Sequence, residues 1–151
     1  MSEPERARKI LVADDEVEIR RFLQDALSAG GFEAHAVGDG AEALREASKS
    51  LYDLIILDIE MPRLNGLEAC RSLRELPLTQ STPILFLTAL KDAPTIERAF
   101  SAGASDYLPK PVHPALLLSR VGNLLRLADQ AGEIQRLRDA LEAFHGSAPK
   151  P

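Results

Sequence analysis

Three aspartates, a threonine and a lysine each stand at the end of a short apolar run. Asp14 and Asp15 follow ILVA, Asp58 follows LIIL, Thr88 follows PILFL and Lys110 follows DYLP. Carboxylates that lie close together repel one another, and a hard divalent cation relieves that repulsion. Mg²⁺ prefers oxygen ligands and is often shared between carboxylates and phosphate. If these runs are strands that end at one edge of a sheet, the sequence predicts a cation site there.

The same residue types suit phosphoryl transfer. A carboxylate such as that of Asp58 can attack phosphorus and form an aspartyl phosphate. The transferring group then needs its oxygens neutralised by a metal ion, a lysine and a hydrogen-bond donor. The cation of the acid pair, Lys110 and Thr88 would supply one of each.

Each of these residues also has an ordinary structural interpretation. Asp14 and Asp15 could be acids of a first helical turn, which the helix dipole favours. Asp58 could be a loop acid, Thr88 is a good strand residue and Lys110 could be a solvated surface lysine. Their coincidence at four strand ends, with nothing comparable at the opposite ends, favours a joint site.

The elements that must position these residues alternate along the chain. Expected strands cover residues 10–13, 32–37, 54–57, 83–89 and 105–110. Helical spacing of apolar residues separates them, and the chain is helical in pattern from Pro114 to Phe144. Asp39, Asn65 and Asp92 are placed to cap three of these helices.

A strand and a helix repeated five times predict an α/β fold. The strands should be parallel, joined by right-handed crossovers, with helices on both faces of one sheet. Such a sheet places its ligand site outside the carboxyl ends of the strands, where the strand order reverses. This is the edge at which the acids, Thr88 and Lys110 are expected to meet.

Composition excludes several classes. The chain has 151 residues, 45% of them hydrophobic, and a net charge of −5, so no basic surface for nucleic acid is expected. The single cysteine, Cys70, and the lack of a signal peptide or a long apolar run predict a cytoplasmic protein outside the membrane. No Cys–His metal cluster, Gly-rich phosphate loop or Ser–His–Asp set is present.

Over residues 8–126 the chain resembles the receiver domain of two-component response regulators. The segments ILVADDE, DLIILDIEMPRLNG, PILFLTA and GASDYLPKP carry the resemblance. It implies a flavodoxin-like, doubly wound five-stranded parallel sheet with strand order 2-1-3-4-5. It also implies a phosphoacceptor signalling module that is served by a sensor histidine kinase and catalyses only its own phosphorylation and dephosphorylation.

The resemblance assigns a role to each site residue. Asp58 would be the phosphoacceptor. Mg²⁺ (or Mn²⁺) would bind Asp14, Asp15, Asp58 and the backbone carbonyl of Glu60. In the same way, Thr88 and Lys110 would stabilise the phosphoryl group, Thr88 and Tyr107 would form the switch, and the bond between Lys110 and Pro111 would be cis. Glu60 and Leu90 occupy positions that tune phosphate lifetime in the family, and a bulky Leu90 predicts slow autodephosphorylation.

The last helix continues beyond the expected end of a receiver domain. Leu127, Ile134 and Leu141 share one heptad position, and Gln130, Leu137 and Phe144 follow three residues later. This a/d pattern predicts a coiled coil, with Glu133 at g facing Arg138 at e′ in a parallel homodimer. A frayed tail or linker is the alternative, since Gly132 and Gln130 weaken the stripe.

The expected organisation is an N-terminal tail (1–8), a receiver domain (9–126), a coiled-coil extension (127–145) and a linker (146–151). The output would be a domain in cis or a partner in trans. Two other functions remain open: an aspartyl-phosphate phosphatase or phosphotransferase, and a dimerisation scaffold that takes no phosphate. Asp58-Ile59-Glu60 lacks the second aspartate of haloacid-dehalogenase-like enzymes, and the acidic ADDEVE segment disfavours a flavodoxin-like cofactor binder.

Overall fold

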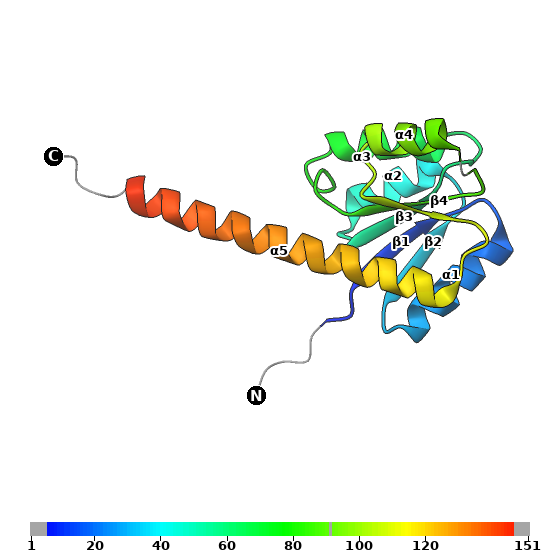
Figure 1. Cartoon of the computed structure of the whole chain (residues 1–151), viewed down its shortest axis with the longest axis horizontal. Helices are drawn as coiled ribbons and strands as arrows, with labels where there is room; N and C mark the ends of the chain where they lie inside the picture. Colours follow the sequence, from blue (N-terminus) through cyan, green and yellow to red (C-terminus); the bar gives the residue numbers. More distant parts are fainter. Residues whose placement is uncertain (1–5, 91, 147–151) are drawn as a thin grey trace.

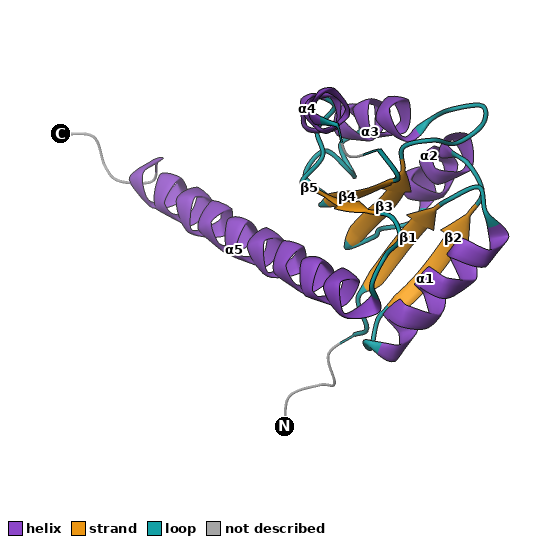
Figure 2. Ribbon diagram, turned by 45° about the vertical axis from the view of Figure 1, so that its right-hand side comes forward, coloured by secondary structure: helices purple, strands orange, loops and turns teal. Residues whose placement is uncertain are grey.

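Five parallel strands form one sheet at the centre of the computed structural model, which describes residues 6–90 and 92–146 (Figures 1 and 2). The strands are β1 (Lys9–Ala13), β2 (Glu33–Val37), β3 (Leu54–Asp58), β4 (Ile84–Thr88) and β5 (Asp106–Pro109). Their order is β2-β1-β3-β4-β5. The predicted fold class and strand order are confirmed.

Helices cover both faces of the sheet because strand side chains alternate between two cores. On β1, Leu11 and Ala13 face α2 (Gly40–Lys49), α3 (Gly66–Glu75) and α4 (Ala93–Ser101). Ile10 and Val12 face the other core, which α1 (Val17–Ala29) and α5 (Pro114–Gly146) complete. Every residue of β3 and β4 is buried, which explains their near-continuous apolar sequences.

Side-chain caps begin three of the helices as the sequence predicts. The carboxylate of Asp39 accepts a hydrogen bond from the N–H of Glu42, the amide of Asn65 from Glu68, and the carboxylate of Asp92 from Thr95. The strands differ from the predicted ranges by one residue at several ends. Pro83, for example, has no N–H to donate, and β4 begins only at Ile84.

The helix α5 extends well beyond the sheet (Figure 1). Its first half packs on the sheet through Leu117, Val121, Leu124 and Leu125. From Asp129 to His145 every residue is exposed. In the part of the chain that is described, no helix combines the length and apolar character that a membrane span requires.

Candidate functional site

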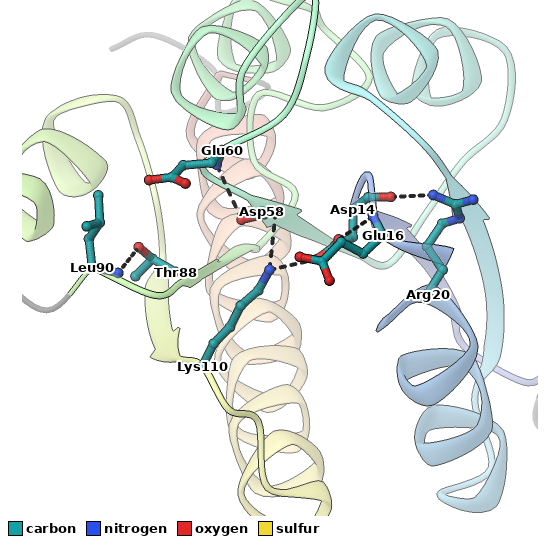
Figure 3. Close-up of polar contacts among 8 residues, drawn as sticks. All are labelled: Asp14, Glu16, Arg20, Asp58, Glu60, Thr88, Leu90 and Lys110. Carbon is teal, nitrogen blue, oxygen red and sulfur yellow. Dashed lines mark hydrogen bonds and ion pairs between the residues drawn. The ribbon is translucent and has the colours of Figure 1, made fainter. Parts of the chain in front are cut away.

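The carboxyl ends of β1, β3, β4 and β5 bring four of the predicted site residues to one rim (Figure 3). Asp14, Asp58 and Thr88 are buried, and Lys110 lies between the two carboxylates. The ammonium of Lys110 is 3.1 Å from Asp14 Oδ2 and 3.2 Å from Asp58 Oδ2. The structure therefore brings Asp14, Asp58 and Lys110 into contact, and Thr88 ends at the same rim.

Asp14 is held from both sides of the β1–α1 turn. Its backbone N–H donates to Val37 of β2, and its Oδ1 accepts from the N–H of Glu16 at 2.9 Å. Arg20, one turn into α1, donates to the backbone carbonyl of Asp14 at 2.7 Å. These contacts orient a carboxylate that is fully buried. Sequence reasoning missed Arg20 because its partner is a backbone atom.

Burial sets the electrostatics of Asp58, which closes β3 and is 5% exposed. Burial raises the pKa of its carboxyl to about 6, Lys110 opposes that rise, and Asp14 adds to it. The N–H of Glu60 donates to Asp58 Oδ1 at 3.3 Å. Above this pKa the group is an anion in a poorly hydrated place, where it favours any cation that can reach it.

Lys110 directly follows β5, the strand that pairs with β4. Its backbone N–H donates to the carbonyl of Thr88 at 2.8 Å, and the following peptide bond, to Pro111, is cis as expected. Burial alone would lower the pKa of the ammonium, but the hydrogen bond to Asp14 and the charges of Asp58 and Asp14 outweigh it and raise the pKa. Lys110 therefore stays charged and joins the two acids.

Gly66 packs the end of the loop that joins Asp58 to α3 against the end of β3. At Gly66 a Cβ would lie 2.2 Å from the carbonyl oxygen of Asp58, so only glycine permits this close packing. The N–H of Gly66 donates to the carbonyl of Ile59 at 3.0 Å. The chain thus turns sharply after Asp58 and begins α3 against the backbone of its own strand.

The middle of that loop rests on the start of α2. The N–H of Gly40 donates to the carbonyl of Leu64, and Asp39 lies 3.5 Å from the guanidinium of Arg63. Arg63 has a φ of 66°, a conformation that costs free energy for a residue with a side chain. The sequence suggested Asp39 as a cap, but it did not reveal this contact with the loop.

Thr88 is the last residue of β4, and Tyr107 lies in the neighbouring strand β5. The hydroxyl oxygen of Thr88 accepts from the N–H of Leu90 at 2.9 Å. Tyr107 is partly buried and makes an edge contact with Phe100 of α4, with 6.2 Å between ring centroids. In Figure 3 the side chains of Thr88 and Leu90 lie apart from the Asp14–Lys110–Asp58 group.

The donor set suits a hard divalent cation. One carboxylate oxygen from each of Asp14, Asp15 and Glu16 lies within 4.8 Å of the others. An adjoining cavity of about 210 Å³ is lined by Asp15, Glu16, Asp58, Glu60, Ala89 and Lys110. Carboxylates beside room for water are what Mg²⁺ prefers. Glu16 was not predicted, although its position directly after Asp14 and Asp15 was a usable signal.

Comparison with known proteins agrees with this geometry. The family described as the response regulator receiver domain matches residues 10–122. The chain belongs to this receiver-domain family. It is a family of two-component signalling domains and not one of catalytic enzymes.

Curated and solved relatives of this receiver domain are numerous. The transcriptional regulatory protein ResD of Bacillus subtilis is 41% identical over 122 residues, which are 81% of this chain and 50% of ResD. The chemotaxis protein CheY4 of Vibrio cholerae has 33% identity and a TM-score of 0.76, covering 79% of this chain and 99% of CheY4. The receiver domain of the sensor histidine kinase PA1611 from Pseudomonas aeruginosa has 30% identity and a TM-score of 0.75, covering 80% and 98%.

Two facts about these relatives bear on function. The structure of the PA1611 receiver domain has a magnesium ion coordinated in its active-site cleft. The present receiver domain spans about half the length of the curated relatives it matches. The likeness therefore concerns the receiver domain of those proteins.

Proposed function

We propose that this receiver domain is a phosphoacceptor switch and that Asp58 takes a phosphoryl group from the phosphohistidine of a sensor kinase. The observation that carries the proposal is the Lys110 ammonium held between the buried carboxylates of Asp14 and Asp58. An oxygen of Asp58 forms the new bond to phosphorus while the bond from phosphorus to the kinase's imidazole nitrogen breaks. Water later cleaves the acyl phosphate and returns the carboxylate.

The residues around Asp58 prepare it for this transfer. A pKa of about 6 leaves the carboxyl ionised at neutral pH and therefore nucleophilic. Lys110 neutralises charge on the incoming phosphoryl oxygens, and the hydroxyl of Thr88 donates a hydrogen bond to one of them. Both residues stand at the rim where such oxygens would lie.

The proposed cation ligands are Asp14, Asp15, Asp58 and the backbone carbonyl of Glu60. Bound Mg²⁺ (or Mn²⁺) supplies positive charge for the phosphoryl oxygens. The acidic cluster and its adjoining cavity support this set, as does the magnesium in the related PA1611 domain. Asp15 is exposed at the rim and can take a ligand role without disturbing the core.

Phosphorylation signals only if it favours one conformation over another. The proposed moving parts are Thr88, drawn toward the phosphoryl group, and Tyr107, which follows it inward. The Tyr107 ring already contacts Phe100 of α4, so its movement changes the surface formed by α4, β5 and α5. That surface is the proposed readout.

We propose that the protein acts in the cytoplasm. The proposed parts of the chain are a tail (1–8), the receiver domain (9–126), a coiled-coil extension (127–145) and a linker (146–151). The output is a domain in cis or a partner in trans, since ResD is a transcriptional regulatory protein about twice as long as the match. The chain itself binds no nucleic acid in this scheme, pairs as a parallel homodimer, and catalyses only its own phosphorylation and dephosphorylation. Its free cysteine, Cys70, is buried, which suits a reducing compartment.

The test is incubation with Mg²⁺ and acetyl phosphate, followed by intact-mass measurement. The wild-type protein should gain one phosphoryl group, and chelation of the metal should abolish the gain. Asp58→Asn should gain none, whereas Asp53→Asn, a matched change at a loop acid before β3, should gain as much as wild type. Equal labelling of Asp58→Asn would refute the proposal.

A further inference from the structure

The second half of α5 exposes a row of large apolar side chains. Leu127, Ile134, Leu137, Leu141 and Phe144 are between 51% and 70% exposed. They fall at heptad positions a and d, with Gln130 as the one polar member, and so lie along one face of the helix. We call this face, from Leu127 to Phe144, the α5 stripe.

From Leu127 to Leu141 the large apolar side chains of the stripe are exposed, and the described residues do not cover them. Every residue from Asp129 to His145 is exposed. The rest of the domain lies beside the first half of α5, before the stripe begins (Figures 1 and 2). Arg8 forms an ion pair with Asp129. A helix of this length is marginal in water by itself, and most helical stability comes from packing an apolar face. The 3.5-residue spacing suits a second helix in particular, because it keeps the seam facing a partner helix along its whole length.

We propose that the α5 stripe of a second copy of this chain provides the cover, in a parallel two-stranded coiled coil. Parallel pairing brings Glu133 at g of one chain to Arg138 at e′ of the other, an attractive contact that occurs twice. With the stripe aligned antiparallel instead, Glu133 would face Ala140 and Arg138 would face Ala131. The charges therefore favour the parallel arrangement.

Gln130 supports the same orientation. In a parallel pair the two Gln130 side chains share one layer, where their amides hydrogen-bond to each other. In the aligned antiparallel pair each would lie against Leu141 and leave its polar groups without a partner in the seam. A single polar layer of this kind fixes register and orientation at some cost in stability.

The consequence is a dimer with both receiver domains at one end. Leu124 and Leu125 are buried in the domain, and the stripe starts at Leu127, so the pairing begins where α5 leaves the sheet. The two Asp58 sites then sit at the same end of the assembly. Gln130 is a polar residue in the apolar stripe, and Gly132 is a glycine within the helix. Both weaken the coiled coil near its N-terminal end, so the dimer should be reversible.

The first test is sedimentation of the full chain over a wide concentration range. Wild type should show a monomer–dimer equilibrium, and Ile134→Glu should be monomeric throughout. Gln135→Glu adds the same charge one position away on the polar face and should dimerise like wild type. Gly132→Ala should lower the dimer dissociation constant about thirtyfold, through about 1 kcal/mol of helix propensity in each chain.

Orientation is tested by oxidising single-cysteine variants made in a Cys70→Ala background. Phe144→Cys should cross-link two copies in a parallel pair, since both sulfurs lie in one layer. In an antiparallel pair they would lie about 25 Å apart, and cross-links would form only between Phe144→Cys and Leu127→Cys chains. That pattern would overturn the proposed orientation.

The dimer proposal itself fails if wild type is monomeric at every concentration or forms a larger oligomer. It fails also if Ile134→Glu lowers the stability of a monomeric receiver domain, because the stripe would then dock on its own chain. Mg²⁺ binding should be the same in Ile134→Glu and wild type, which keeps this test separate from the proposed phosphoacceptor function.

Discussion

Gly40 donates its backbone N–H to the carbonyl oxygen of Leu64 at 3.1 Å, so the first turn of α2 supports the loop that follows Asp58. A Cβ at position 40 would lie 2.2 Å from the same oxygen. The contact thus requires glycine, and any side chain there must push the loop away. The loop carries the carbonyl of Glu60, the proposed cation ligand, so Gly40 supports the site from a distance.

Gly40→Ala should therefore weaken Mg²⁺ binding and stability together. Overpacking of this kind costs about 1–3 kcal/mol in unfolding free energy, and displacement of the Glu60 carbonyl should raise the Mg²⁺ dissociation constant. Urea unfolding and calorimetric Mg²⁺ titration measure the two effects. Gly122→Ala is the control, because a Cβ there meets nothing within 4 Å and should stabilise α5 by up to about 1 kcal/mol. An unchanged Mg²⁺ affinity in Gly40→Ala would show that the loop is not held by α2.

Removal of the Lys110 charge should expose the repulsion between Asp14 and Asp58. Both acids are buried, and loss of one partner from a buried ion pair costs about 3–5 kcal/mol. We expect Lys110→Met to be destabilised by about that amount without metal and to regain much of that stability in saturating Mg²⁺.

Thermal unfolding with EDTA and with Mg²⁺ measures the stability of the Lys110→Met protein in both conditions. Lys49→Met, at an exposed lysine paired with Glu46, should change little in either. An equal loss in both conditions would contradict the idea that Mg²⁺ and Lys110 neutralise the same acids.

Asp58 should make the metal-free protein less stable as pH rises. Burial raises its pKa from 3.8 to about 6, so the folded state keeps a proton that the unfolded state has already released. The stability present below pH 4 is therefore lost as pH rises through 6, by about 3 kcal/mol at most. Asp58→Asn removes this loss, and its stability advantage over wild type should grow between pH 4 and 6 and then level off.

Denaturant unfolding in EDTA across that pH range measures the difference. Asp92→Asn is the control, because hydrogen bonds from Thr95 lower the pKa of Asp92 and its ionised form favours folding. That variant should gain no stability at neutral pH. A pH-independent difference between Asp58→Asn and wild type would show that Asp58 titrates alike in both states.

The sequence predicted the rim because buried parallel strands appear as apolar runs and their carboxyl ends share one edge. Asp14, Asp58, Thr88 and Lys110 each end or follow such a run, so their meeting follows from topology alone. The caps were equally visible, since capping depends on residues three positions apart. Local spacing and strand alternation were sufficient for these features.

Contacts made to backbone carbonyl oxygens could not be predicted in this way. Arg20 binds the carbonyl of Asp14, and Gly40 binds the carbonyl of Leu64. Every residue has a backbone carbonyl, so the residue type does not show which carbonyl accepts such a hydrogen bond. The positive φ of Arg63 is similarly a result of its surroundings, because glycine would be the expected residue there.

Leu90 should prolong the life of the phosphorylated state. It is 40% exposed and, with Asp15 and Glu60, lines a second cavity at the rim. Because it shares this cavity with Asp15 and Glu60, we expect its side chain to hinder the water that would attack phosphorus on Asp58. Leu90→Ala removes this hindrance while keeping the backbone hydrogen bond to Thr88. We expect autodephosphorylation to accelerate on the order of tenfold, a barrier change of about 1.4 kcal/mol.

The decay of phosphorylated protein, followed by intact mass after the phosphodonor is removed, gives the rate. Leu78→Ala, an equally large truncation at an exposed leucine of the α3–β4 connection, should decay like wild type. Wild-type decay within seconds, or identical decay of Leu90→Ala, would rule out shielding by this side chain.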